Sequence, residues 1–60
     1  MKPKMDNVDA IMIAEGNLDV SEEEQIEAWQ HLVDTGLAWK LQGFFGRTAQ
    51  RLIDEGVINA

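Results

Sequence analysis

Cysteine is absent from this 60-residue chain, which also has only one proline, one histidine and no tyrosine. Without cysteine, the fold cannot gain stability from disulfide bonds or from a thiolate metal site. Every apolar run is too short, or too often interrupted by acidic residues, to form a signal peptide or a membrane span. The single histidine has no evident partners for metal binding or nucleophilic catalysis. We therefore expect no enzyme activity, no cofactor, no metal and no membrane contact.

Two features resemble sites but have simpler explanations. His31 stands between Glu27 and Asp34 on an expected helix, where a lone surface histidine usually has no catalytic role. The acidic run over 22–27 lacks the alternating oxygen ligands and the turn glycine of a calcium loop. Its place at the start of a helix, where carboxylates stabilise the positive end of the helix dipole, accounts for it.

Basic residues are scarce, since 5 lysines and arginines stand against 11 acidic residues and give a formal net charge of -6. This sign disfavours non-specific binding to nucleic acids or anionic lipids. The formal charges between Met5 and Asp34 are all negative, whereas those between Thr35 and Ile53 are Lys40, Arg47 and Arg51. The folded molecule should therefore have an acidic side and a basic side.

Apolar spacing predicts a first helix near the start of the chain. Asp6 or Asn7 can cap it, and Gly16 with Asn17 can end it. The residues that recur at intervals of three and four are Met5, Val8, Ile11 and Met12. The β-branched content leaves a strand over 10–14 as an alternative.

A second helix has a clear start. Ser21 is followed three residues later by Glu24, the spacing of a capping box. Thr35 and Gly36 close the helix. Its expected buried face consists of Ile26, Trp29, Leu32 and Val33.

Two further helices complete the predicted fold. Residues 37–42 allow a short helix that Gly43 interrupts, and a last helix ends at Gly56, after which Val57 and Ile58 fold back on the core. The apolar face of this last helix consists of Phe45, Ala49, Leu52 and Ile53. We expect an all-α fold, a compact bundle of three to four short helices, in one domain over residues 7–60 after a flexible tail over residues 1–6.

The small size of the chain limits its stability. A domain of about 60 residues buries only about 60% of the surface that its unfolded chain exposes. With no cysteine for disulfides or metal, association with other chains is the most accessible source of further burial. A homodimer is therefore one expected partner arrangement.

The segment Gly43-Phe44-Phe45-Gly46-Arg47 contains the sharpest candidate for a binding site. Two consecutive phenylalanines on a short turn cannot easily both point inward, so one should be exposed beside Arg47. Trp39 is the tryptophan expected at a groove edge. The candidate partner-binding residues are Trp39, Lys40, Phe44, Arg47 and Arg51. In the structural alternative, Phe45 is core, Gly46 allows close helix approach, and the arginines neutralise acidic side chains.

The strings Leu-Ala-Trp-Lys-Leu-Gln-Gly over 37–43 and Phe-Gly-Arg-Thr-Ala over 45–49 resemble a family of small proteins encoded by tailed bacteriophages. In that family, an acidic helical half precedes a segment of this type, and the resemblance extends from about residue 10 to about residue 58. It implies a phage origin and a small helical fold. Together with the lack of a signal peptide or membrane span, a phage origin leads us to expect a location in the host cytoplasm. The resemblance carries no catalytic residue to this chain. Small acidic phage proteins often bind and redirect host proteins.

These observations favour a protein-binding module that modulates or inhibits a host protein, with a host or phage protein as its partner. The main alternative is a helix-turn-helix-like protein in which 37–42 and 45–55 form the helix pair and Arg47, Gln50 and Arg51 meet DNA. A minor virion component is a third possibility. Nucleic acid remains the weaker candidate, because three basic residues neutralise few phosphates.

Overall fold

The part of the chain that the structure describes forms four helices and no strand, as the apolar spacing predicts. The computed structural model describes residues 5–16 and 19–60. Its helices are α1 (Asn7–Ala14), α2 (Glu22–Asp34), α3 (Leu37–Lys40) and α4 (Gly43–Asp54). Residues 10–14 are helical rather than extended. The predicted all-α bundle is confirmed.

Side-chain caps fix the starts of the first two helices. Asp6 accepts a hydrogen bond from the backbone N–H of Asp9 at 2.8 Å, and Ser21 accepts one from the N–H of Glu24 at 3.2 Å. Each bond satisfies a backbone donor that has no partner within its helix. The stop expected at Asn17 and residues 1–4 of the expected tail lie outside the described residues.

Left-handed glycines mark helix ends and turn the chain back on itself. Gly36 has φ of +81° and separates α2 from α3, and Gly56 has φ of +78° and follows α4. After α4, the N–H of Gly56 donates to the carbonyl of Ile53 at 3.0 Å, and that of Val57 donates to the carbonyl of Leu52 at 2.9 Å. This pair of bonds is a Schellman motif. It directs the chain toward the core, where Ile58 is buried as predicted, whereas Val57, which was also expected there, is 38% exposed.

The last helix begins earlier than the sequence suggested. Gly43 and Phe44 belong to the first turn of α4, and Gln42 before them has φ of -56° and ψ of 154°. The prediction of a short turn around the two phenylalanines was therefore wrong. The first N–H groups of a helix need no partner within it, and with Phe45 buried against the core the helix begins two residues earlier. Because successive side chains of a helix are about 100° apart, Phe44 and Phe45 point in different directions.

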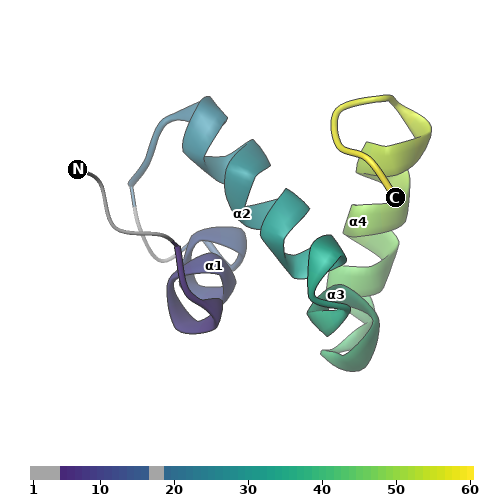
Figure 1. Cartoon of the computed structure of the whole chain (residues 1–60), viewed down its shortest axis with the longest axis horizontal. Coiled ribbons are helices and arrows are strands. Elements are labelled where there is room, and N and C mark those ends of the chain that lie inside the picture. The colour runs from purple at the N-terminus through teal and green to yellow at the C-terminus, as the bar shows by residue number, and fades with distance from the viewer. Residues whose placement is uncertain (1–4, 17–18) are drawn as a thin grey trace.

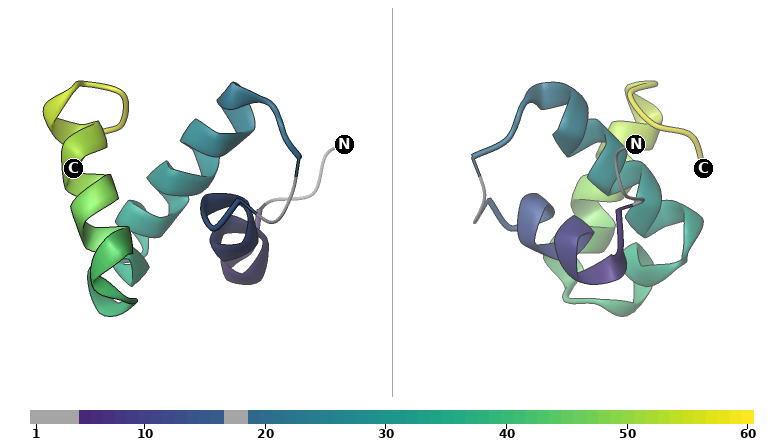
Figure 2. Two further views of the ribbon diagram at one scale, coloured as in Figure 1. Left: turned by 180° about the vertical axis from the view of Figure 1, so that it is seen from behind. Right: turned by 60° about the vertical axis from the view of Figure 1, so that its left-hand side comes forward.

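The helices are arranged as a V with one covered side. Figure 1 shows α2 and α4 as two arms that diverge from α3, with α1 beside α2 on the side away from α4, and the reverse view in Figure 2 agrees. The radius of gyration is 10.6 Å, close to the ~10 Å expected of a compact chain of this length. The open side of the V is what positions the candidate site.

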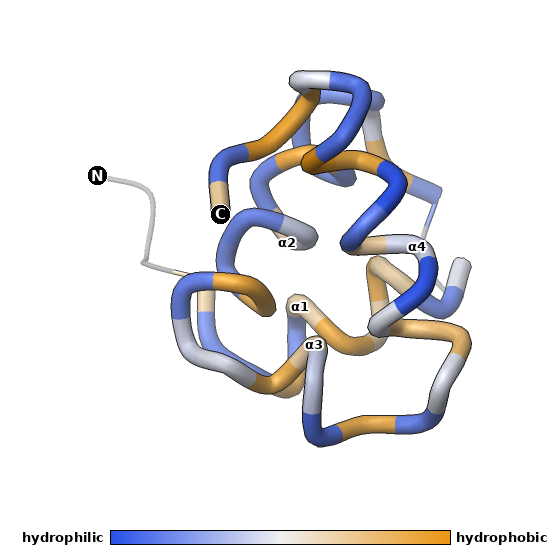
Figure 3. The backbone as a smooth tube through the Cα atoms, turned by 90° about the vertical axis from the view of Figure 1, so that its right-hand side faces the viewer, coloured by the Kyte–Doolittle hydropathy of each residue, from blue (hydrophilic) through white to orange (hydrophobic). Residues whose placement is uncertain are grey.

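The core is small and is built mainly from short side chains. Four of its ten buried residues are alanines, and among the larger side chains only Leu32 is buried completely. The remaining core residues are Ile13, Trp29, Val33, Phe45 and Ile58. Hydrophobic and hydrophilic residues alternate along the helices (Figure 3), as expected where each helix buries one face. No described helix is long and apolar enough to cross a membrane.

Two glycines should respond in opposite ways to alanine. Gly36→Ala places a side chain in the left-handed region and should lower the free energy of unfolding by about 1 kcal/mol. A Cβ at Gly46 would lie 3.6 Å from the Ala38 carbonyl oxygen, in ordinary contact. Gly46→Ala should therefore raise the free energy of unfolding by up to ~1 kcal/mol through helix propensity. Thermal denaturation followed by circular dichroism tests both variants. Shifts of the melting temperature in the same direction would contradict the different backbone conformations of the two glycines.

Candidate functional site

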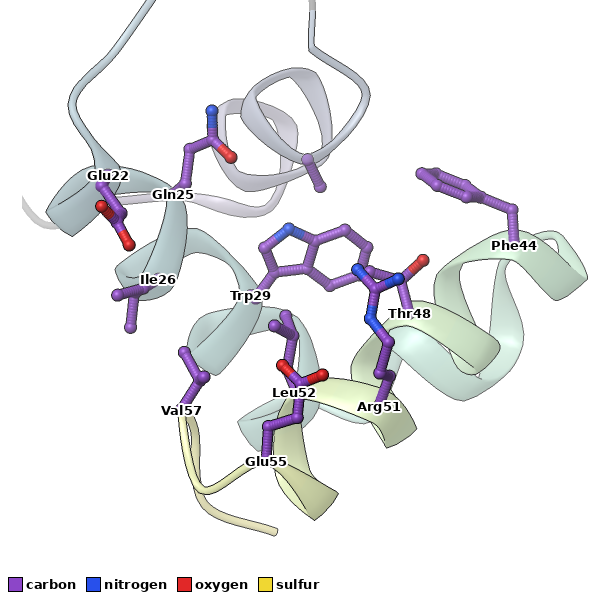
Figure 4. A pocket seen from close by; sticks show the side chains of 11 residues that line it. Glu22, Gln25, Ile26, Trp29, Phe44, Thr48, Arg51, Leu52, Glu55 and Val57 are labelled. Atoms are coloured by element: carbon purple, nitrogen blue, oxygen red, sulfur yellow. The ribbon is translucent and has the colours of Figure 1, made fainter.

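An open groove lies between the two arms of the V. It has a volume of about 580 Å³ and runs between the N-terminal half of α2 and the face of α4 that looks toward it (Figure 4). Its lining residues are Ala14, Glu22, Gln25, Ile26, Trp29, Phe44, Thr48, Arg51, Leu52, Glu55 and Val57. Apolar side chains therefore come from both arms and from the segment after α4.

Three aromatic rings join the arms at one end of this groove. The rings of Trp29 and Phe44 meet edge to face with their centroids 6.0 Å apart, and those of Trp29 and Phe45 are 5.9 Å apart. Phe45 is buried, whereas Phe44 is 42% exposed. One phenylalanine is thus core and the other reaches the surface, as the sequence predicted. The exposed ring borders the groove.

A polar link holds the chain after α4 against α2. The side-chain amide of Gln30 donates to the carbonyl oxygen of Asn59 at 2.8 Å, and its Oε1 accepts from the N–H of Asn59 at 2.8 Å. Gln30 also donates to Asp34 at 2.9 Å. We call the Gln30–Asn59 pair of bonds the C-terminal link. The sequence alone does not indicate this link, because no local pattern joins residues 29 positions apart.

The walls of the groove differ in charge. Glu22 stands at the start of the α2 wall, in an N-terminal turn that also carries Glu23 and Glu24. Arg51 extends from α4 into the groove, and Glu55 lies one turn further along (Figure 4). Within residues 5–16 and 19–60, Arg51 forms no ion pair. The groove thus carries unpaired charge on both walls.

Trp39 lies on a different side of α4. It is 50% exposed, and its ring packs beside Gly46, where an added Cβ would lie 3.7 Å from the indole. Gly46 is two residues after Phe44, so the two positions point about 200° apart around the helix. The structure therefore separates Trp39 from Phe44.

The five candidate partner-binding residues thus do not form one surface. Phe44 and Arg51 line the groove, whereas Trp39 and Lys40 are exposed on α3. Arg47 is not among the residues that line the groove. Its guanidinium lies beside Gly43, where an added Cβ would be 3.1 Å from Nη1. Arg47 and Arg51 are four residues apart on α4, but only Arg51 lines the groove. Phe44 points away from Trp39 because it is part of α4, which begins earlier than predicted.

His31 has a structural role in the described fold. Its Nε2 lies 2.8 Å from Asn7 Oδ1, which connects α2 to the start of α1. The residue is half-buried and borders a second hollow of about 400 Å³ together with Glu23, Glu27 and Asp34. No group of three or more metal-ligating side chains is found within 5–16 and 19–60.

The fold and the groove define a small all-α domain with an open apolar surface between two helices. The chain belongs to the family described as a domain of unknown function, DUF7417, whose match covers residues 2–60. Comparison with curated proteins and with solved structures gives no match.

The C-terminal link can be tested with matched glutamine variants. Gln30→Ala removes both bonds to Asn59, so amide hydrogen exchange at Asn59 should become faster and the free energy of unfolding should fall by about 1 kcal/mol. Gln50→Ala is the control, because among the described residues the side chain of Gln50 bonds only Asp54 on its own helix, at 3.0 Å. Unchanged exchange at Asn59 in Gln30→Ala would show that the link does not hold the segment.

Proposed function

We propose that this protein is a protein-binding module that modulates or inhibits a protein of a phage-infected host cell. The observation that carries the proposal is Trp39, a large aromatic side chain that is half exposed yet packed beside the backbone of α4 at Gly46. A rigid exposed tryptophan loses little conformational entropy on binding and is a frequent centre of protein interfaces. The likeness to phage proteins supports a partner in the host.

Charge indicates the chemistry of the partner surface. Lys40 follows Trp39 on α3, and Arg47 is exposed on the first turns of α4. Both belong to the basic part of an otherwise acidic chain. A partner with carboxylates around an apolar pocket would complement this surface, and such complementarity favours specificity and rapid association. We call the exposed pair Trp39 and Lys40 the Trp39 surface.

The DNA-binding alternative is less well supported by the same geometry. Arg47, Gln50 and Arg51 would have to face the phosphates and bases from α4. Asp54 lies on the same side of the helix and accepts a hydrogen bond from Gln50 at 3.0 Å. A carboxylate in this row would repel phosphates.

The test is capture of partners from host-cell lysate with the tagged chain, with and without nuclease. Trp39→Ala should lose most of a stoichiometric partner protein that survives nuclease, because hot-spot truncations cost 2 kcal/mol or more, about 30-fold in affinity. Val8→Ala is the matched control, since Val8 is an exposed apolar residue on α1.

Two results would contradict the proposal. Equal capture by Trp39→Ala and the unchanged chain would show that Trp39 does not contribute to partner binding. Loss of every partner after nuclease treatment would favour nucleic acid instead. Circular dichroism of each variant establishes that the fold is retained.

A further inference from the structure

The groove leaves several apolar side chains exposed to water, and covering them would stabilise the chain. Phe44 is 42% exposed and Val57 38% exposed, and the neighbouring Ile26 and Leu52 are only half-buried. Covering such side chains contributes about 25 cal/mol for each Å² removed from water. Four of the ten buried residues are alanines, so the core itself contributes little stabilisation, and covering the groove would add to it.

Two charges of the groove, Glu22 and Arg51, would face each other if a second copy of the groove were turned around against the first. The α2 wall begins with Glu22 and its acidic neighbours, and the α4 wall carries Arg51, without an ion pair in the described chain, with Glu55 one turn further along. A two-fold axis through the groove would place α4 of each copy against α2 of the other. Each Arg51 then meets the acidic start of the opposite α2, and the contact forms twice, as in an isologous dimer.

We therefore propose that the groove between α2 and α4 is the interface of a symmetric homodimer. Two V-shaped chains interlock so that the four arms form a short four-helix arrangement around Phe44, Ile26, Leu52 and Val57. Opposite charges at Glu22 and Arg51 offset the repulsion between two chains of charge -6 each.

A stable dimer sets a minimum for the area that each chain must bury. A stable complex buries about 800 Å² on each partner, which is about a fifth of the 4238 Å² that this chain exposes. An interface of that size must include the facing sides of both arms. A second copy can cover both by placing its own arms against them. The Trp39 surface lies on another side of α4, so the inference does not rest on the proposed function.

Sedimentation equilibrium of the full chain from about 1 µM to about 1 mM tests the proposal, because mass action shifts a monomer to a dimer over such a range. We expect a dimer at the upper end. Phe44→Glu and Val57→Glu should each prevent dimerisation, since each places a charge in the apolar contact. Val8→Glu should leave it unchanged, because Val8 is exposed on α1 outside the groove.

Charge reversal tests the two-fold arrangement. Glu22→Lys and Arg51→Glu should each weaken dimerisation by about tenfold, since each change affects both symmetric pairs. The double variant should recover most of that loss. Circular dichroism identifies any variant that unfolds, and Val57→Glu, outside the helices, serves if Phe44→Glu does so.

A monomer at every concentration would overturn the dimer and leave the groove to a different protein. A dimer that persists in both Phe44→Glu and Val57→Glu would place the interface elsewhere. A double charge reversal as weak as either single change would overturn the two-fold pairing. None of these results alters capture through Trp39, so the two proposals fail separately.

Discussion

The position of α4 relative to α2 depends on the indole of Trp29. Backbone contacts follow the chain from α2 to α3 and from α3 to α4, whereas the two long arms meet through aromatic rings, with Phe45 at 5.9 Å and Phe44 at 6.0 Å from Trp29. Offset and edge-to-face contacts of this kind stabilise beyond the area they bury. The rings fill one end of the V, and the other end stays open. The groove is thus a direct result of how few large side chains the core contains.

Local signals in the sequence predicted most of the secondary structure. The caps at Asp6 and Ser21 and the stops at Gly36 and Gly56 each depend on residues within one turn, so spacing alone identifies them. The start of α4 was missed because burial of Phe45 is a tertiary effect that outweighs the poor helix propensity of Gly43. The candidate site could likewise be predicted only where local sequence decided it. Individual exposed residues such as Trp39 and Phe44 could be named, but their separation required knowing where α4 begins.

Two separate surfaces would allow one small chain to associate with itself and with another protein at once. The proposed dimer uses the apolar groove with its Glu22 and Arg51 charges, and the proposed partner contact uses Trp39 and Lys40. A two-fold dimer would present two copies of the Trp39 surface. Binding of both copies to a partner with repeated sites would raise the apparent affinity without any new contact.

The C-terminal link also bears on how the sequence can vary. Gln30 recognises the backbone N–H and C=O of Asn59, not its side chain. Any residue with a backbone N–H can therefore occupy position 59, and proline alone among the common residues cannot donate the bond. Position 30, in contrast, needs a side chain of the right length that both donates and accepts. Related chains should thus tolerate exchange at position 59 far more readily than at position 30, although both residues share the same two hydrogen bonds.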